Sequence, residues 1–184
     1  MTVRAYKGAL YGSGKQMPPD PPFNSNWADD TQPMVNVTWD DANWFCILND
    51  GHLPTEAEWE YAAKGRSTVP HYGNTDDIMW HSGNSNNKAH DVKEKSPNYL
   101  GLYDTLGNVW EWVDDWYDEK YYSHSPASDP IQNEKGGAEQ ERNERVLRGG
   151  SWAKGPELAR LSDRNRADPN IRRQGFGFRC AQNH

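Results

Sequence analysis

One stretch of the chain anchors the interpretation of the rest: Leu53-Pro54-Thr55-Glu56-Ala57-Glu58-Trp59-Glu60-Tyr61-Ala62. Glu58 follows Thr55 by three residues, which is the capping-box spacing that begins an α-helix. Glu56 and Glu58 fall in the first turn, where the helix dipole favours acidic side chains. Gly65 is positioned to end this helix. We therefore interpret both glutamates as helix-start acids rather than as catalytic groups.

A second helix precedes it. Residues 33–38 suggest a short strand that runs into a helix start, because Thr38 can cap and Asp41 follows three residues later. The run Asn49-Asp50-Gly51 stops this helix. Downstream, we expect strands at 108–113, with Val109 and Glu111 on one face, at 145–148 before a glycine kink, and at 176–180.

The remaining segments predict loops. Residues 1–33 are rich in Gly, Pro, Asn and Asp, which is typical of extended, irregular chain, with Trp27 as its anchor on the core. Residues 66–100 predict polar loop, as do residues 114–144, with an exposed part at 133–143. The six histidines include His71, His81, His90 and His124, which lie in loops without metal-ligand spacing.

Composition bounds the class of protein. The chain has 184 residues, of which 34% are hydrophobic, and its mean hydropathy is −1.08. Nine Trp, nine Tyr and four Phe still predict a small, Trp-rich core in a single domain spanning residues 1–184. The net charge of −7 disfavours nonspecific binding to nucleic acid or anionic membranes. We expect no membrane insertion and see no secretion signal, which leaves the location open, a virion or cell surface included.

Several strings then carry a resemblance. They are Val37-Thr38-Trp39-Asp40-Asp41-Ala42, the stretch 53–62, Gly101-Leu102-Tyr103-Asp104, Gly107-Asn108-Val109-Trp110-Glu111-Trp112, Arg148-Gly149-Gly150-Ser151-Trp152 and Gly177-Phe178-Arg179-Cys180. In this order, from about Pro33 to Cys180, they resemble the formylglycine-generating enzyme (sulfatase-modifying factor) family. The resemblance implies an α+β domain with a C-type-lectin-like fold, two helices, short twisted strands and abundant loop.

The resemblance also exposes a departure. Oxidase members of the family use a cysteine pair between the Gly-Gly-Ser-Trp and Gly-Phe-Arg strings to bind copper and the substrate cysteine. Between Trp152 and Gly177 this chain has neither Cys nor Met, although Cu(I) needs thiolate or thioether ligands. We therefore expect no copper, no catalytic residues and no enzyme. Cys46 and Cys180 match family positions that are paired in some members, so they form a disulfide or two buried thiols.

Besides copper, the resemblance implies a calcium site. Its ligands would be the side chains of Asp104 and Glu111 and the carbonyls of Gly107 and Val109. Calcium accepts such mixtures of hard oxygen ligands. The alternative is that Asp104 caps a turn and Glu111 pairs with an arginine.

The C-terminal segment resembles, more specifically, the variable proteins of diversity-generating retroelements, which share this fold. Those proteins diversify the segment between the two glycine-bearing strings, here about 148–180, mostly at template AAY codons. Such codons exclude Lys154, Glu157 and Gln174 and permit eleven display positions: Ala153, Gly155, Leu158, Leu161, Asp163, Asn165, Ala167, Asp168, Ile171, Arg173 and Gly175. The alternative is that Leu158 and Leu161 belong to the core, while Arg160, Arg164 and Arg172 are framework.

These observations predict a non-enzymatic ligand-binding protein that displays a variable surface to a protein or other surface ligand. Loops held by a rigid scaffold can change their side chains without disturbing core packing. The alternative is a formylglycine-generating oxidase acting on a protein cysteine.

Overall fold

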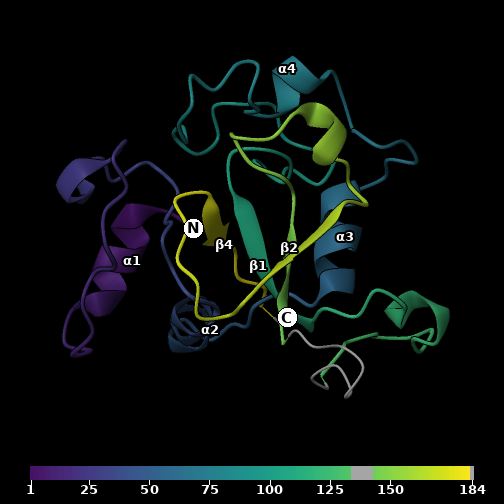
Figure 1. Cartoon of the computed structure of the whole chain (residues 1–184), viewed down its shortest axis with the longest axis horizontal. Helices are drawn as coiled ribbons and strands as arrows, with labels where there is room; N and C mark the ends of the chain where they lie inside the picture. The colour runs from purple at the N-terminus through teal and green to yellow at the C-terminus, as the bar shows by residue number, and fades with distance from the viewer. Residues whose placement is uncertain (134–142, 183–184) are drawn as a thin grey trace.

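The computed structural model describes residues 1–133 and 143–182, and its centre is a four-stranded sheet (Figure 1). The strands are β1 (Trp110–Trp116), β2 (Arg145–Arg148), β3 (Arg164–Ala167) and β4 (Phe176–Phe178), in the order β3-β2-β1-β4. β2 is antiparallel to both β1 and β3, whereas β4 runs parallel to β1 with Trp112 opposite Phe178. The segment predicted to vary, about 148–180 and called the display segment below, therefore begins at the end of β2, includes β3 and returns to the sheet at β4.

Four helices pack around this sheet: α1 (Val3–Leu10), α2 (Trp39–Leu48), α3 (Glu56–Lys64) and the single turn α4 (Thr75–Ile78). Three short 3-10 turns lie at Ser25–Trp27, Tyr121–Ser123 and Pro156–Leu158. Both predicted capping boxes are formed, at Thr38 and at Thr55, and these helices end where Asn49 and Gly65 predict. The expectation of only two helices was wrong.

The core has two parts, one on each side of the sheet. α1 and α2 pack with β4 and with Trp110 and Trp112 of β1, whereas α3 packs with Val113 and Val146 through Trp59. Figure 1 shows α3 on one side and α1 and α2 on the other. Since β1 is covered on both faces, most of its side chains are buried.

The N-terminal segment corrects one prediction, because residues 3–10 form α1 rather than extended chain. Thr2 caps this helix by accepting a hydrogen bond from the Ala5 amide, at 3.3 Å, and Val3 and Tyr6 are fully buried. Tyr6 stacks on Phe45 of α2 with ring centroids 5.5 Å apart. Tertiary packing therefore stabilises a short helix that the glycine-rich residues after it did not predict. Trp27 is the anchor predicted for this segment, with its Nε1 donating to the Pro18 carbonyl at 2.9 Å.

Strand bounds differ more than helix bounds. β1 begins at Trp110 and extends to Trp116, and β4 ends at Phe178. Residues 33–38 form only an isolated bridge between Pro33 and Thr2, and β3 was not predicted. The predicted exposed loop at 133–143 falls largely outside the described residues.

A disulfide joins Cys46 of α2 to Cys180, just after β4, with Cα atoms 5.4 Å apart. It closes a loop of 134 residues, so it restricts the unfolded chain strongly. None of the helices in the described residues is long and apolar enough to cross a membrane.

Candidate ligand-binding site

A hollow of about 660 Å³ lies between β3, β4 and the segment that follows β2. Its floor is apolar and comes from the framework: Trp110, Trp152 and Phe176 all line it and are at least nine-tenths buried. The floor is rigid because Trp110 pairs with Phe176 across β1 and β4, and the Trp152 amide donates to the Asn108 carbonyl at 2.7 Å. Its volume falls in the range of small-ligand pockets.

Seven of the eleven predicted display positions line this hollow: Ala153, Asn165, Ala167, Asp168, Ile171, Arg173 and Gly175. Asn165 and Ala167 alternate along β3 with Arg164 and Arg166, so the two pairs project to opposite faces of the strand. Ala167 is largely buried, whereas Ala153, Asp168 and Arg173 are exposed. The structure thus gathers residues spread over 23 positions of the sequence around one floor.

The other four display positions lie away from the hollow, in residues 155–163. Leu158 is about half exposed, but Leu161 is buried in the core beside α3, so its prediction as a displayed residue was wrong and the core alternative was right. Asp163 is partly buried, and its carboxylate is 2.7 Å from Arg160 Nη2. Gly155 is partly buried before the 3-10 turn.

Sequence reasoning missed further residues that line the hollow: Glu144, Lys154, Arg166 and Gln174. Codon reasoning set Lys154 and Gln174 aside, and a fixed residue can still contribute to a binding site. Arg166 projects from the other face of β3, but β3 is an edge strand of the sheet, so this long side chain still borders the hollow. No hydrophobic periodicity in the sequence predicts this strand.

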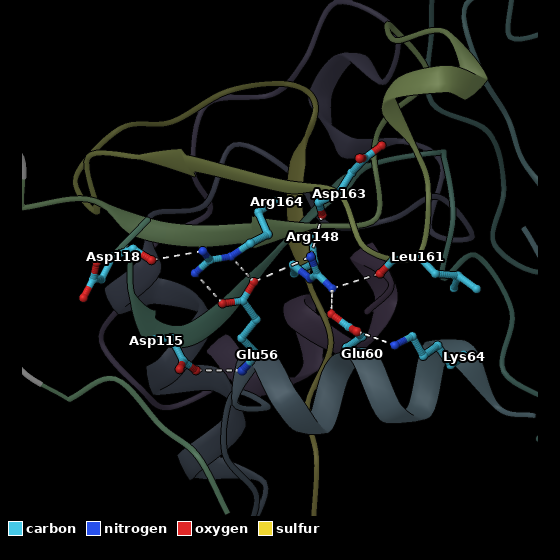
Figure 2. Close-up of polar contacts among 9 residues, drawn as sticks. All are labelled: Glu56, Glu60, Lys64, Asp115, Asp118, Arg148, Leu161, Asp163 and Arg164. Carbon is cyan, nitrogen blue, oxygen red and sulfur yellow. Dashed lines mark hydrogen bonds and ion pairs between the residues drawn. The ribbon is translucent and has the colours of Figure 1, made fainter. Parts of the chain in front are cut away.

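A buried ion network holds the other half of the display segment to α3 (Figure 2). Arg148, fully buried, donates to the carbonyls of Leu161 at 2.9 Å and Asp163 at 2.7 Å. Its Nη2 also lies 2.5 Å from Glu60 Oε2. One guanidinium therefore connects β2, helix α3 and the chain leading to β3.

Arg164 completes this network. Its Nε and Nη2 donate to the two oxygens of Glu56 at 2.7 and 2.8 Å, the bidentate geometry that suits a buried carboxylate. Arg164 behaves as the framework residue that was predicted, and so does Arg172, which pairs with Asp41 at 2.5 Å. Glu56 begins α3 as expected, but it is also buried in this network, which helix-start reasoning did not predict.

Asp115 closes the network from β1. Its Oδ2 accepts the Glu56 amide at 2.6 Å and its Oδ1 accepts the Gln132 amide at 2.8 Å. Burial raises the pKa of Asp115 to about 6, against the lowering effect of these two hydrogen bonds. The carboxyl group thus titrates closer to neutral pH than an ordinary aspartate.

Two of the predicted calcium ligands, Asp104 and Glu111, bind other protein groups, and Glu111 does so as the alternative predicted. Glu111 accepts hydrogen bonds from Arg179 Nε and from Trp59 Nε1, both at 2.6 Å, so it pairs with an arginine. Asp104 accepts the Lys93 amide at 2.8 Å, and burial raises its pKa. Asp104, Val109 and Glu111 line one cavity, but Gly107 does not.

This donor set fits calcium poorly, since the Arg179 guanidinium already neutralises Glu111. No group of three or more acidic, His or Cys side chains suited to a metal occurs among the residues that the structure describes. Calcium here stays a prediction, and calorimetric titration of chelator-stripped protein tests it.

The segment in which the family's oxidases carry their copper-binding cysteines lacks those donors: residues 153–176 hold no sulfur, and the two cysteines of the chain form the disulfide. The histidines have local partners instead. His81 Nε2 lies 2.8 Å from Asp76 Oδ1, and His90 Nε2 lies 2.7 Å from the Ser85 carbonyl oxygen.

Comparison with known proteins places this arrangement in a family. The family described as "Sulfatase-modifying factor enzyme 1-like domain" matches residues 12–184. The formylglycine-generating enzyme of Streptomyces coelicolor is 37% identical over 169 residues, covering 81% of this chain and 52% of that protein. The serine/threonine-protein kinase pkn1 of Chlamydia pneumoniae is 38% identical over 152 residues, covering 82% of this chain and 24% of that protein. The chain thus spans about half or less of the length of these relatives.

Solved structures agree on the fold. PvdO from Pseudomonas aeruginosa superposes with a TM-score of 0.82 at 24% identity, over 96% of this chain and 75% of that one. Treponema denticola variable protein 1 gives a TM-score of 0.73 at 27% identity, over 97% of this chain and 80% of that one. With its C-type-lectin-like architecture and its family match over nearly the whole length, the chain belongs to the sulfatase-modifying factor enzyme 1-like (formylglycine-generating enzyme) family.

Proposed function

We propose that this chain is a non-enzymatic ligand-binding protein whose C-terminal segment, residues 153–175, supplies a variable recognition surface for a protein or other surface ligand. The hollow carries the proposal: seven predicted display positions surround a floor of framework aromatics. Side chains on the rim can change while Trp110, Trp152 and Phe176 keep their packing. Ligand pockets commonly combine such a rigid apolar floor with a few placed polar groups.

Two further observations support the proposal. The ion network of Arg148 and Arg164 fixes the C-terminal end of residues 156–164, the anchored half of the segment, so changes on the rim need not propagate into the sheet. The similarity in fold and sequence to Treponema denticola variable protein 1, whose name describes a variable protein, supports the variable character that we propose for this chain. Together they favour a scaffold with a replaceable surface.

The second candidate is formylglycine-generating activity, which the 37% identity to the Streptomyces coelicolor enzyme favours. Its chemistry would need sulfur ligands for Cu(I), and residues 153–176 contain none. One related mouse protein is named inactive C-alpha-formylglycine-generating enzyme 2 and is 33% identical over 169 residues. Its name describes a relative without this enzymatic activity. Binding is therefore the better-supported function.

Sequencing the 3′ end of the gene across sibling clones tests the variable surface. We expect differences at the hollow positions other than the buried Ala167 and at Leu158, and constancy at Ala167, Leu161, Arg148 and Arg164. Identical sequences in many clones would leave a fixed binder, and differences scattered over the whole gene would contradict a dedicated display segment.

Incubation with a cysteine-containing sulfatase peptide and Cu(I) tests the enzyme. We expect no aldehyde product by mass spectrometry, with an active formylglycine-generating enzyme as the positive control. Turnover by this chain would overturn the non-enzymatic part of the proposal.

A further inference from the structure

One corner of the hollow presents hydrogen-bond donors. Trp152 Nε1 is buried and has no acceptor in the described part of the chain, although its residue lines the hollow. A Cβ built on Gly175 would lie 3.8 Å from this nitrogen and 3.9 Å from Ser151 Oγ, so all three groups meet at one corner. A buried N–H without an acceptor costs free energy, which an acceptor on a ligand would recover.

The charges of the side chains around the hollow indicate that this acceptor is negatively charged. Lys154, Arg166 and Arg173 bring three positive charges to the hollow, against Glu144 and Asp168. Glu144 is 3.0 Å from Arg166 Nε, and Asp168 accepts the Asn170 amide at 2.8 Å. Within residues 1–133 and 143–182, Lys154 and Arg173 have no carboxylate within ion-pair distance.

This local excess of positive charge stands out on a chain whose net charge is −7. An anionic group would therefore be attracted to this rim and repelled by much of the remaining surface. The floor adds an independent requirement, because Trp110, Trp152 and Phe176 offer apolar surface that only an apolar group can cover.

We infer that the hollow binds an acidic peptide segment in which a carboxylate is next to a large apolar side chain. The carboxylate accepts hydrogen bonds from Trp152 Nε1 and Ser151 Oγ at the Gly175 corner. Its apolar neighbour covers the aromatic floor, and Lys154 and Arg173 attract the segment from the rim. This inference rests on the proposed function and names the chemical class of its ligand.

A nucleic acid is the competing polyanion, and the site suits it less. Phosphate backbones are bound by extended rows of Lys and Arg, whereas this rim interleaves three cations with two carboxylates. One carboxylate beside an apolar group satisfies the donors, the charge and the floor together.

The test begins with an unbiased probe, a phage-displayed random heptapeptide library panned on the full chain. We expect enriched peptides that combine Asp or Glu with an adjacent Phe, Trp, Leu or Ile. Binding of a synthetic copy should weaken at least tenfold when its acid becomes the amide, since a hydrogen bond to a charged group is lost. The same binding should fall as salt rises.

Matched variants locate the site. Gly175→Ala would place a methyl group at ordinary contact distance in the donor corner, so it should fold normally and lower affinity about tenfold. Gly8→Ala on α1, where a methyl group meets nothing within 4 Å, is its control. The double variant Lys154→Gln, Arg173→Gln should lower affinity and flatten the salt dependence, whereas Arg160→Gln on the anchored half should leave both unchanged.

The outcomes separate the two proposals. Enriched peptides that compete at the hollow but carry no acidic preference, or preferential binding of oligo(dT), would overturn the acidic-peptide inference and leave a ligand-binding protein. No enrichment above that of the Gly175→Ala variant, combined with turnover of the sulfatase peptide, would overturn the proposed function and the inference with it.

Discussion

The two halves of the display segment are built on opposite principles. Residues 156–164 are held from below by buried charge: Arg148 binds their carbonyls and Arg164 pairs with Glu56 of α3 (Figure 2). Residues 165–175 instead border an open hollow over aromatic rings. One segment can therefore be both fixed and adaptable, because buried ion pairs hold residues 156–164 while residues 165–175 border the hollow.

Breaking the anchor should have the largest effect. Arg148→Met leaves Glu60 without its closest buried partner and two carbonyls without a donor, so we expect a loss of about 3–5 kcal/mol in the free energy of unfolding. Urea unfolding measures it. Arg160→Gln, which removes an exposed arginine from the same half, should change stability little. Equal effects for the two variants would contradict the anchoring role.

Leu161 and Leu158 allow a buried and an exposed position of the anchored half to be compared. Leu161→Ala removes a fully buried side chain and should cost about 2–4 kcal/mol, because a cavity remains beside α3. Leu158→Ala, at an exposed position, should cost less than about 0.5 kcal/mol. Thermal and urea unfolding of both variants check the prediction. A larger loss of stability for Leu158→Ala than for Leu161→Ala would contradict the burial of Leu161 in the core.

Proton binding offers a further test, because Asp115 of β1 accepts a hydrogen bond from Glu56 in the network beneath the anchored half and does not line the hollow. Its pKa of about 6 in the folded state exceeds the value of an unfolded aspartate, near 3.9, so the folded state holds the proton more tightly. This group therefore stabilises the fold most when protonated, and its contribution falls as pH rises from about 4 to 6.

We expect the stability difference between the parent chain and Asp115→Asn to shrink by about 2 kcal/mol over that window. The variant does not titrate at this position, so its constant offset cancels in the difference. A difference that grows with pH would show that the two backbone hydrogen bonds outweigh burial.

The smallest effect is expected at the hollow. The triple variant Ala153→Ser, Asp168→Asn, Arg173→Gln changes only exposed side chains and should alter the free energy of unfolding by less than about 0.5 kcal/mol. Calorimetry of the folded protein measures it. A loss comparable to that of Leu161→Ala would mean that these residues support the fold and are not free to vary.

The predictions from sequence succeeded where the signal is local. Capping boxes at Thr38 and Thr55 fix helix starts through contacts within four residues, so the sequence alone locates them. They failed for α1, because the Gly-rich residues that follow it resemble a loop and because its stability comes from burying Val3 and Tyr6 against distant residues. They failed likewise for β3, because its sequence Arg-Asn-Arg-Ala shows no alternation of apolar residues. This strand forms through its pairing with β2, which depends on the tertiary structure.

The same division applies to the site. The family strings and the absence of sulfur between Trp152 and Gly177 can be read from the sequence alone, which also predicts the positions of the segment that would differ. Three features required the folded chain: Leu161 enters the core, seven of those positions share one hollow, and the donors of Trp152 and Ser151 meet at Gly175. The physical reason is that helix caps and residue chemistry are properties of short stretches, whereas burial, charge pairing and a shared hollow depend on which distant residues the sheet brings together.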